Sequence, residues 1–429
     1  MVFYGLNSLM DAFFVGRYVG DAAMAGVSMA YPLSQISTAF GSLIGVGAGS
    51  ALSIALGAND RDTQRKAMGN VNMMTVVSTI LFMIFGLLMS EQMISVMGGT
   101  GDVLVQGNAY FRVTVLGSIF WIYGLAANMI IRAEGKMKTA AWMMGLGLGV
   151  NILANYIFIV QLDMGVEGAA WGTNLGMFVY SLLGWIYFAR GKATFDAKVL
   201  SFRYDKAMTV NISRLGLSSA LMLIMNLVQS LVVFNALARY GTTADVAFYG
   251  VVYRLYQFLI TPIFGLMRAV APAIGINYGA NKYERAIQAY KVFSVAALVL
   301  TIPLWLISLI APYSVLGLMV TETIITGSQI TYFRVFMAIL PLMSFIYMAM
   351  TFFPAIDKGK PATIIGMARQ FVFYVPVMLI IPRFMGVPGV YYGSFAIDAV
   401  IVVWTILMVN KEFRTLRKKA QAIKEIRVA

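Results

Sequence analysis

Long apolar runs are the feature that most limits the folds open to this chain. Of its 429 residues, 60% are hydrophobic and only 12% are charged, and the mean hydropathy is +0.80. A transmembrane helix needs about 20 apolar residues, and backbone groups in lipid must be hydrogen-bonded internally, as they are in a helix. We therefore expect an all-α integral membrane protein with about twelve transmembrane helices. The runs are the opening segment through Arg17, then 22–56, 67–89, 108–131, 139–160, 167–189, 209–239, 246–278, 290–311, 326–352, 361–382 and 388–410. The opening run is short, so the first helix is expected to be truncated.

Basic residues are concentrated in alternate loops, which predicts the orientation of the chain. The net charge of +14 would suggest nucleic acid in a soluble protein, but cytoplasmic loops of membrane proteins carry an excess of Lys and Arg. We expect the basic loops and both termini in the cytoplasm, with the lipid bilayer and no nucleic acid as partner. The basic set includes Arg61, Arg65, Lys66, Arg132, Lys136, Lys138, Arg190, Lys192, Lys282, Arg285, Lys358, Lys360 and Lys411.

The absence of cysteine and histidine limits the chemistry that the chain can perform. Without cysteine there are no disulfides and no thiolate metal sites. Without histidine there is no side chain that ordinarily titrates near neutral pH. Handling of protons or cations must then fall to carboxylates, amides and hydroxyls. No nucleotide-binding loop, metal cluster or nucleophile–base set is visible, so we expect no cofactor and no enzyme.

An internal repeat divides the chain into two halves. Three sets of residues recur at the same separation of 222 positions. They are Tyr31 and Gln35 with Tyr253 and Gln257, Gly57–Asn59 with Gly279–Asn281, and Tyr110–Val113 with Tyr332–Val335. We predict pseudo-symmetric lobes of about six helices each, at 1–189 and 209–410, joined by a cytoplasmic loop at 190–208 and followed by a basic tail at 411–429. Repeats with a site between them are typical of alternating-access transporters.

Asp11 is an acid in an apolar run, where an ionisable group costs about 2.5–3.5 kcal/mol on insertion scales. Such a group usually faces a cavity, although one near a helix end can instead reach water. Two further charges, Arg369 and Asp398, lie deep in the runs 361–382 and 388–410. Because buried charges almost always pair, we predict an intramembrane ion pair between them, serving either as a scaffold or in ion coupling.

Several motifs together resemble those of the multidrug and toxic compound extrusion (MATE) exporters, and specifically of their DinF-like branch. The MATE exporters belong to a larger group that also includes lipid flippases. The resemblance covers essentially the whole chain. It is carried by Asp11–Arg17, Gly57–Asn59, Arg132–Gly135, Asn151–Leu153, Gly168–Thr173 and Pro272–Ala280.

The resemblance implies two lobes around a V-shaped cavity and export of amphipathic, mostly cationic compounds, driven by protons or sodium. It also implies a cation-coupling site inside the first lobe, at Asp11, Asn151, Asn155 and Thr173. The family pattern has Asp where this chain has Asn155, which leaves one carboxylate and favours a single proton over sodium. Asn151 and Asn155 are four apart and therefore share a helix face, where they serve either as interhelical hydrogen-bond donors or as partners of Asp11.

A second coupling arrangement known in the family uses acids in the seventh and tenth helices. Here 209–239 and 326–352 contain no acid, and Gln229 stands where the repeat would place a counterpart of Asp11. Four residues on helices flanking the expected cavity are substrate-binding candidates, because aromatic rings attract cations. They are Tyr31, Gln35, Tyr253 and Gln257.

The sequence thus favours a proton-coupled antiporter, with sodium as the other possible ion. It would be a monomer in a prokaryotic plasma membrane that exports small amphipathic molecules by alternating access. The alternative is a flippase for a lipid-linked precursor, which should line its cavity with basic residues. Arg254 and Arg268 keep that reading open.

Overall fold

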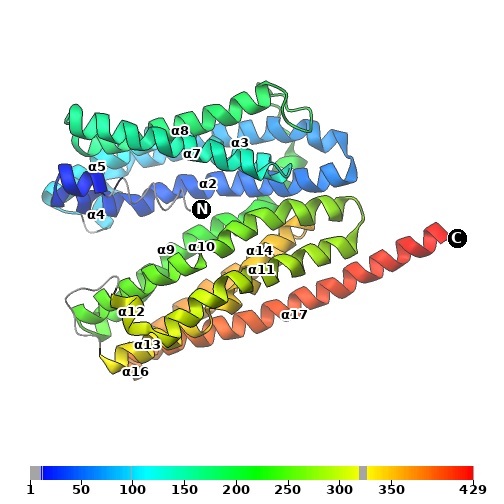
Figure 1. The fold of residues 1–429 in the computed structure, drawn as a ribbon. Coiled ribbons are helices and arrows are strands. Elements are labelled where there is room, and N and C mark those ends of the chain that lie inside the picture. The colour runs from blue at the N-terminus through cyan, green and yellow to red at the C-terminus, as the bar shows by residue number, and fades with distance from the viewer. Residues whose placement is uncertain (1–10, 12, 98, 318–325, 429) are drawn as a thin grey trace. The chain divides into compact units, whose positions relative to one another are not determined.

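The chain is described by a computed structural model that covers residue 11 and residues 13–97, 99–317 and 326–428 (Figure 1). Across these residues the regular structure is helical and no strand occurs, so the predicted all-α class is confirmed. The predicted truncation of the first helix concerns residues 1–10, which lie outside the described residues. Of that helix, Asp11 and 13–18 are helical.

The chain divides into two compact units, Met1–Leu223 and Ile224–Ala429, which we call the amino-terminal and carboxy-terminal units. The first contains α2 (Asp21–Ala58), α3 (Arg61–Leu88), α4 (Ser90–Val96), α5 (Gly101–Leu116), α6 (Ser118–Ala133), α7 (Met137–Asn155), the π-helical η1 (Tyr156–Gln161) and α8 (Gly165–Ala189). The helix α9 (Lys206–Tyr240) runs from the first unit into the second. The second contains α10 (Thr243–Gly279), α11 (Tyr283–Ile310), α12 (Pro312–Gly317), α13 (Gly327–Ala338), η2 (Leu340–Leu342), α14 (Met343–Ala355), α15 (Gly359–Met367), the π-helical η3 (Ala368–Tyr374), α16 (Val375–Met385) and α17 (Val387–Val428). The lobe boundaries drawn from the repeat, 1–189 and 209–410, stay a prediction.

Membrane-length helices account for most of the described residues. Nine are long and apolar enough to cross a bilayer, and a tenth span results if the bent pair α5 and α6 is counted as one. The 25 residues of α8 also suffice for a span. Together with the helix that contains Asp11, these elements are compatible with the predicted total of about twelve.

The repeat is visible in the backbone of both units. A short helix directly follows a long one in each, as α4 after α3 and as α12 after α11. A π-helical segment occurs further along each unit, as η1 and as η3. The left-handed residues recur at the separation seen in the sequence: Asn59 with φ of 57° and Asn281 with φ of 58°. Asparagine tolerates this conformation at a helix end. The two units are therefore built by the same local rules.

The predicted run 108–131 is not one straight helix. It is broken at Gly117 into α5 and α6, which are bent by 53°. The Asn174 side chain lies against this break, where a Cβ at Gly117 would come within 2.1 Å of its Oδ1 atom. The Asn174 Nδ2 atom donates to the Val113 carbonyl at 2.7 Å. The bend thus depends on a glycine and on a polar side chain that compensates the interrupted helix.

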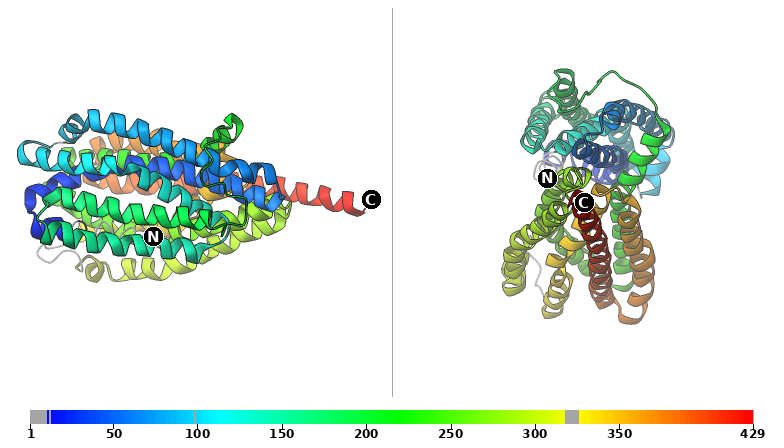
Figure 2. Two further views of the ribbon diagram at one scale, coloured as in Figure 1. Left: turned by 90° about the horizontal axis from the view of Figure 1, so that it is seen from above. Right: turned by 90° about the vertical axis from the view of Figure 1, so that its right-hand side faces the viewer.

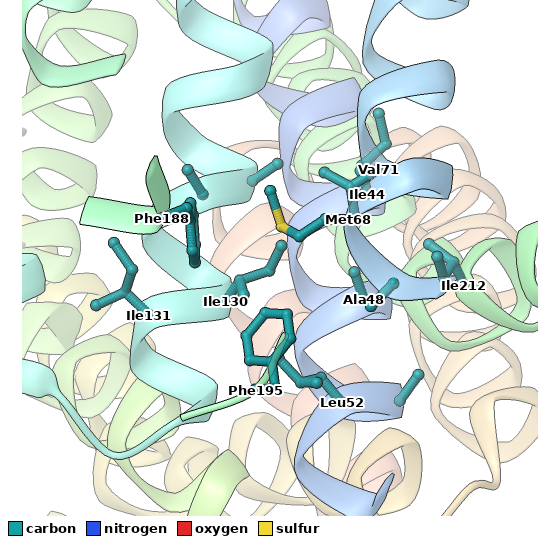
Figure 3. Close-up of a cluster of buried hydrophobic side chains, with 14 of the residues drawn as sticks. Ile44, Ala48, Leu52, Met68, Val71, Ile130, Ile131, Phe188, Phe195 and Ile212 are labelled. Atoms are coloured by element: carbon teal, nitrogen blue, oxygen red, sulfur yellow. The ribbon is translucent and has the colours of Figure 1, made fainter. Parts of the chain in front are cut away.

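The polar stretch after α8 packs into the hydrophobic core of the amino-terminal unit and forms hydrogen bonds with it. Phe195 is 6% exposed and belongs to a buried cluster with Leu52 and Ile130 (Figure 3). The Asn72 Nδ2 atom of α3 donates to the carbonyls of Val199 and Ser201 at 2.8 and 2.9 Å. This stretch is therefore a structured part of the amino-terminal unit.

The carboxylate of Glu134, at the end of α6, forms hydrogen bonds with the same stretch. The Glu134 Oε2 atom accepts hydrogen bonds from the backbone N–H and the hydroxyl of Thr194, at 2.6 and 2.9 Å. The ammonium group of Lys136 lies 4.0 Å from that oxygen and donates to the Lys192 carbonyl. Burial raises the pKa of the Glu134 carboxyl, although the hydrogen bonds from Thr194 oppose this effect.

The start of α9 packs closely on α2 within the amino-terminal unit. A Cβ at Gly47 would lie 2.0 Å from the Ile212 carbonyl oxygen, and one at Gly216 would lie 1.8 Å from the Leu43 carbonyl oxygen. Two glycines therefore allow two backbones to touch, as is common between membrane helices. This contact explains why the first half of α9 belongs to the amino-terminal unit although the repeat assigns it to the second lobe.

The last helix is continuous from the membrane span into the predicted basic tail. The 42 residues of α17 extend about 63 Å at 1.5 Å per residue, and the helix continues past the other helices of its own unit (Figures 1 and 2). Near the start of the tail, the Glu412 carboxylate is bound by Lys358 Nζ at 2.7 and 2.8 Å. The tail is an extension of the span.

Asn72→Ala should weaken the attachment of the polar stretch. The substitution removes the donor to two loop carbonyls. Leaving such groups unsatisfied costs about 1–3 kcal/mol of folding stability. The purified protein in detergent should therefore unfold at a lower temperature. Asn410→Ala, at an exposed position, is the matched control and should change stability by less than about 0.5 kcal/mol. Equal transitions for the two variants would contradict this role of Asn72.

Glu134→Gln should change how stability depends on pH. Because the pKa of Glu134 is raised above 4.5, the folded state binds this proton more tightly than the unfolded state. The stability that this proton provides is fully present below the unfolded pKa and is lost as the pH rises through the folded pKa. The glutamine variant cannot titrate, so its thermal transition should rise relative to wild type across that window. A difference between the two proteins that is constant with pH would contradict the assignment.

Candidate functional site

The Asp11 carboxylate is buried and receives hydrogen bonds from two other helices. The Asn155 Nδ2 atom donates to Asp11 Oδ1 at 2.6 Å, and the Thr173 hydroxyl donates to Asp11 Oδ2 at 2.9 Å. The Asn151 Nδ2 atom lies 3.4 Å from Asp11 Oδ1 and 3.1 Å from the Thr173 hydroxyl oxygen. The structure thus brings all four predicted cation-coupling residues into one connected cluster.

Burial decides between the two environments considered for Asp11. Its exposed fraction is 7%, and those of Asn151, Asn155 and Thr173 are 1%, 0% and 3%. Asp11 is therefore enclosed by protein and does not reach bulk water. Asn151 and Asn155 do connect helices, as polar amides in membranes commonly do, and the partner that they share is this carboxylate.

Two oxygens at the cluster have no hydrogen-bond partner within the part of the chain that the structure describes. The Oδ1 atoms of Asn151 and Asn155 are both buried without a hydrogen bond, whereas their amino groups face Asp11. Amino and hydroxyl donors around a carboxylate suit its charged form. A protonated Asp11 needs an acceptor, and rotation of either amide supplies one. The same oxygens, with the carboxylate and the hydroxyl, are also the ligand type that hard cations prefer. The described residues include no cluster of three or more acids that would hold a divalent metal.

A stripe of glycines on α8 allows the cluster to form. Gly168, Gly172 and Gly176 are spaced four apart and so share one helix face. A Cβ at Gly172 would lie 2.1 Å from Asn155 Oδ1, and a Cβ at Gly176 would lie 2.7 Å from both Asn151 Cβ and the Gly147 carbonyl oxygen. Gly168 and Gly172 belong to the motif Gly168–Thr173, which by itself predicts no role for the stripe. The spacing itself is the signal, since small residues four apart mark close helix contacts in membranes.

The substrate-binding candidates lie on α2 and α10. Tyr31 is 45% exposed, and Gln35 is half-buried and accepts from the Thr38 hydroxyl at 3.3 Å. The Gln257 Nε2 atom donates to the Tyr253 hydroxyl at 2.8 Å. Each pair lies one helical turn apart within its own unit, and their role in substrate binding stays a prediction.

The carboxy-terminal unit contains a second buried polar cluster. Arg369 Nε and Nη2 donate to the two Asp398 oxygens at 2.7 and 3.2 Å, so the structure brings this predicted pair together in a bidentate ion pair. Beside it, Gln370 Nε2 donates to Gln229 Oε1 at 2.7 Å. The exposed fractions of Arg369 and Asp398 are 7% and 4%, which places both charges inside the protein.

Comparison with known proteins finds similarity to membrane exporters over most of the chain. The profile of the family described as MatE matches residues 1–157 and 215–380. The multidrug export protein MepA of Staphylococcus haemolyticus is 29% identical over 399 residues, covering 93% of this chain and 87% of its own. MepA of Staphylococcus aureus is 26% identical over 408 residues, covering 95% and 89%.

Solved structures agree with the sequence relatives. A crystal structure of a MATE protein in the bent conformation matches with a TM-score of 0.90 at 25% identity, covering 98% of this chain and 93% of that one. The straight conformation matches with a TM-score of 0.88 at 25% identity, covering 97% and 93%. The fold of the described chain is therefore the fold of these proteins.

Gly176→Ala should disturb the contact between α7 and α8. The added methyl group would meet a backbone carbonyl, which cannot rotate away, and overpacking of this kind costs about 1–3 kcal/mol. The thermal transition of the purified protein should fall accordingly. Gly149→Ala is the matched control on α7, because a Cβ there meets nothing within 4 Å. If both variants unfolded at the same temperature, the glycine stripe would not set the helix spacing.

Proposed function

The chain belongs to the MatE family, and on that premise we propose that it is a cation-coupled multidrug antiporter. It exports amphipathic, mostly cationic compounds by alternating access and takes up a coupling ion in exchange. Membership in the family makes the protein a membrane transporter and not an enzyme, as the sequence predicts. The curated relatives that carry the name multidrug export protein match nearly the full chain, which supports this substrate class.

The observation that carries the proposal is the buried Asp11 cluster. A carboxylate inside the hydrocarbon region is costly unless it has a function or a partner. Among the described residues, the hydrogen-bond partners of Asp11 are two amides and a hydroxyl, which stabilise its charge but do not neutralise it. We therefore propose that Asp11 is the group that binds the exchangeable coupling cation. Because Asn155 supplies an amide in place of a second carboxylate, one proton neutralises the site, and we propose the proton as coupling ion.

The geometry gives proton binding a mechanical consequence. In the charged form Asp11 draws the amino groups of Asn151 and Asn155 and the Thr173 hydroxyl toward itself. A proton on Asp11 reverses one of these bonds, since the carboxyl becomes a donor, and the orphaned amide oxygens can then turn inward. Asn155 is the last residue of α7 before the π-helical η1, and π-helical turns often occur at functional sites. We propose that protonation changes the packing of η1 against α8.

The placement of the charged loops supports the proposed orientation. Arg65 lies 3.7 Å from Asp196, and Lys66 lies 3.3 Å from Asp205, so the basic start of α3 meets the polar stretch after α8. We propose that this end of the amino-terminal unit faces the cytoplasm. A multi-pass monomer in the prokaryotic plasma membrane, with both termini cytoplasmic, completes the proposal. Tyr31, Gln35, Tyr253 and Gln257 are proposed as substrate contacts.

Asp11→Asn should abolish coupled efflux and leave the fold intact. Asparagine preserves the shape of the site but cannot take a proton. In vesicles that contain the protein, an imposed proton gradient should drive transport of a fluorescent organic cation, and the variant should fall to the level of empty vesicles. Asp163→Asn is the matched control, because Asp163 is exposed and its φ of 50° suits asparagine.

The outcomes separate the competing readings. Efflux driven by a sodium gradient alone would show that sodium, and not the proton, is the coupling ion. Full efflux by Asp11→Asn would contradict the role of the cluster. No dye movement under either gradient, from inserted and folded protein, would contradict the exporter proposal and favour a flippase for a lipid-linked precursor.

A further inference from the structure

The carboxy-terminal unit repeats the architecture of the Asp11 cluster with its charges rearranged. In the amino-terminal unit, an amide at the edge of η1 donates to an acid on the first helix: Asn155 Nδ2 to Asp11 at 2.6 Å. In the carboxy-terminal unit, an amide in η3 donates to an oxygen of α9: Gln370 Nε2 to Gln229 Oε1 at 2.7 Å. The bond is the same, but the acceptor is now neutral.

The carboxylate of this second cluster stands on a different helix and has a fixed partner. Asp398 lies on α17 and is held by two hydrogen bonds from Arg369 of η3. Both residues lie within helices that have the length and hydropathy of membrane spans. Arg369 is also held by its neighbour Tyr374, whose ring centroid lies 5.1 Å from the guanidinium carbon. This is a cation–π contact, and it fixes the position of the charge.

The two clusters differ in how the charge of their buried carboxylate is balanced. A buried carboxylate in a membrane needs a positive charge or a proton. Asp11 contacts amides and a hydroxyl among the described residues, and in the proposed function an exchangeable cation supplies its positive charge. Asp398 has a guanidinium instead, which stays protonated at any pH that a protein survives and cannot leave because it is part of the chain.

We propose that Arg369 is a tethered counter-cation for Asp398. It holds the carboxy-terminal unit permanently in the charge-neutral condition that the amino-terminal unit reaches only when its coupling ion binds. The coupling of one ion per cycle then follows, because just one of the two clusters can exchange its cation. The comparison between the two units rests on the proposed function, whereas the tether itself can be tested without transport.

Within the described part of the chain, no group other than Arg369 near Asp398 can take this role. The other titratable neighbours found there are tyrosines, which are neutral near physiological pH. They are Tyr249 and Tyr256 of α10, Tyr347 of α14 and Tyr374 of η3. Among the described residues, Arg369 is the one cation that contacts Asp398. Removing its charge should therefore convert Asp398 into a carboxyl that binds a proton.

Proton uptake by purified protein in detergent tests the tether directly. On acidification from mildly alkaline to mildly acidic pH, Arg369→Gln should take up one proton more per molecule than wild type. The double variant Arg369→Gln with Asp398→Asn is the matched control and should lose this additional proton. Equal uptake by wild type and folded Arg369→Gln overturns the proposal.

Stability provides a second measurement if Arg369→Gln folds poorly. Protonation of Asp398 should stabilise the single variant, so its thermal transition should rise on acidification relative to that of the double variant. The double variant should unfold near the wild-type temperature, because both charges are removed together. A single variant that does not respond to pH relative to the double variant overturns the proposal.

Transport separates a static tether from a pair that opens during the cycle. The double variant contains no buried charge at this place and should export a fluorescent organic cation with the wild-type dependence on the proton gradient. A folded double variant without coupled efflux shows that the pair itself takes part in coupling, which overturns the tether. Asp11→Asn should take up one proton fewer than wild type. If it does not, the proposed function of Asp11 falls, whereas an additional proton in Arg369→Gln still supports the tether.

Discussion

The cost of a charge in a hydrocarbon environment is the constraint on which the polar architecture of this protein depends. Lipid offers no water to solvate an acid, so each buried carboxylate must be balanced by donors, by a cation or by a proton. The amino-terminal unit surrounds Asp11 with amides and a hydroxyl and leaves its charge to be neutralised. The carboxy-terminal unit supplies Asp398 with a guanidinium. One repeated fold thereby holds two buried carboxylates, one hydrogen-bonded by neutral donors and proposed to exchange a cation, the other paired with a guanidinium.

Close contact between helix backbones makes the open cluster possible. Three side chains reach Asp11 from α7 and α8 because glycines on α8 bring these helices together. The same device joins α2 to α9 at Gly47 and Gly216. Association of helices in lipid lacks the hydrophobic driving force of water and depends on such packing and on interhelical hydrogen bonds. The glycine stripe is therefore as much a part of the site as the residues that contact the carboxylate.

The polar stretch after α8 shows how charge patterning and packing combine. Its basic residues mark an orientation, but its place is fixed by Phe195 in the core, by Asn72 and by Glu134. The stretch 190–208, which the sequence predicts to be a loop between the lobes, is thus a structured part of the amino-terminal unit. The boundary between the compact units falls later, inside α9. Contacts decide that boundary, and the pattern of apolar runs does not contain them.

Much of the fold was predictable because lipid imposes simple rules on a sequence. Run length indicated the helices, a separation of 222 residues indicated the repeat, and isolated charges in apolar runs indicated Asp11, Arg369 and Asp398. The resemblance to the MATE exporters added the partners of Asp11, which spacing alone could not supply, since they lie 140 or more positions away. Local rules also could not predict the bend at Gly117, which depends on Asn174 of another helix.

By itself, then, the sequence determined that the chain is helical, membrane-spanning, repeated and short of charges in its interior. These properties follow from composition and period, which act on each segment separately. The tertiary structure alone decided which donors meet which carboxylate and that Arg369 neutralises Asp398. It also decided that, among the described residues, two amide oxygens at the Asp11 cluster remain unpaired and Asp11 has no such cation. Those outcomes depend on distances between helices that are remote in sequence, and no local propensity encodes such distances.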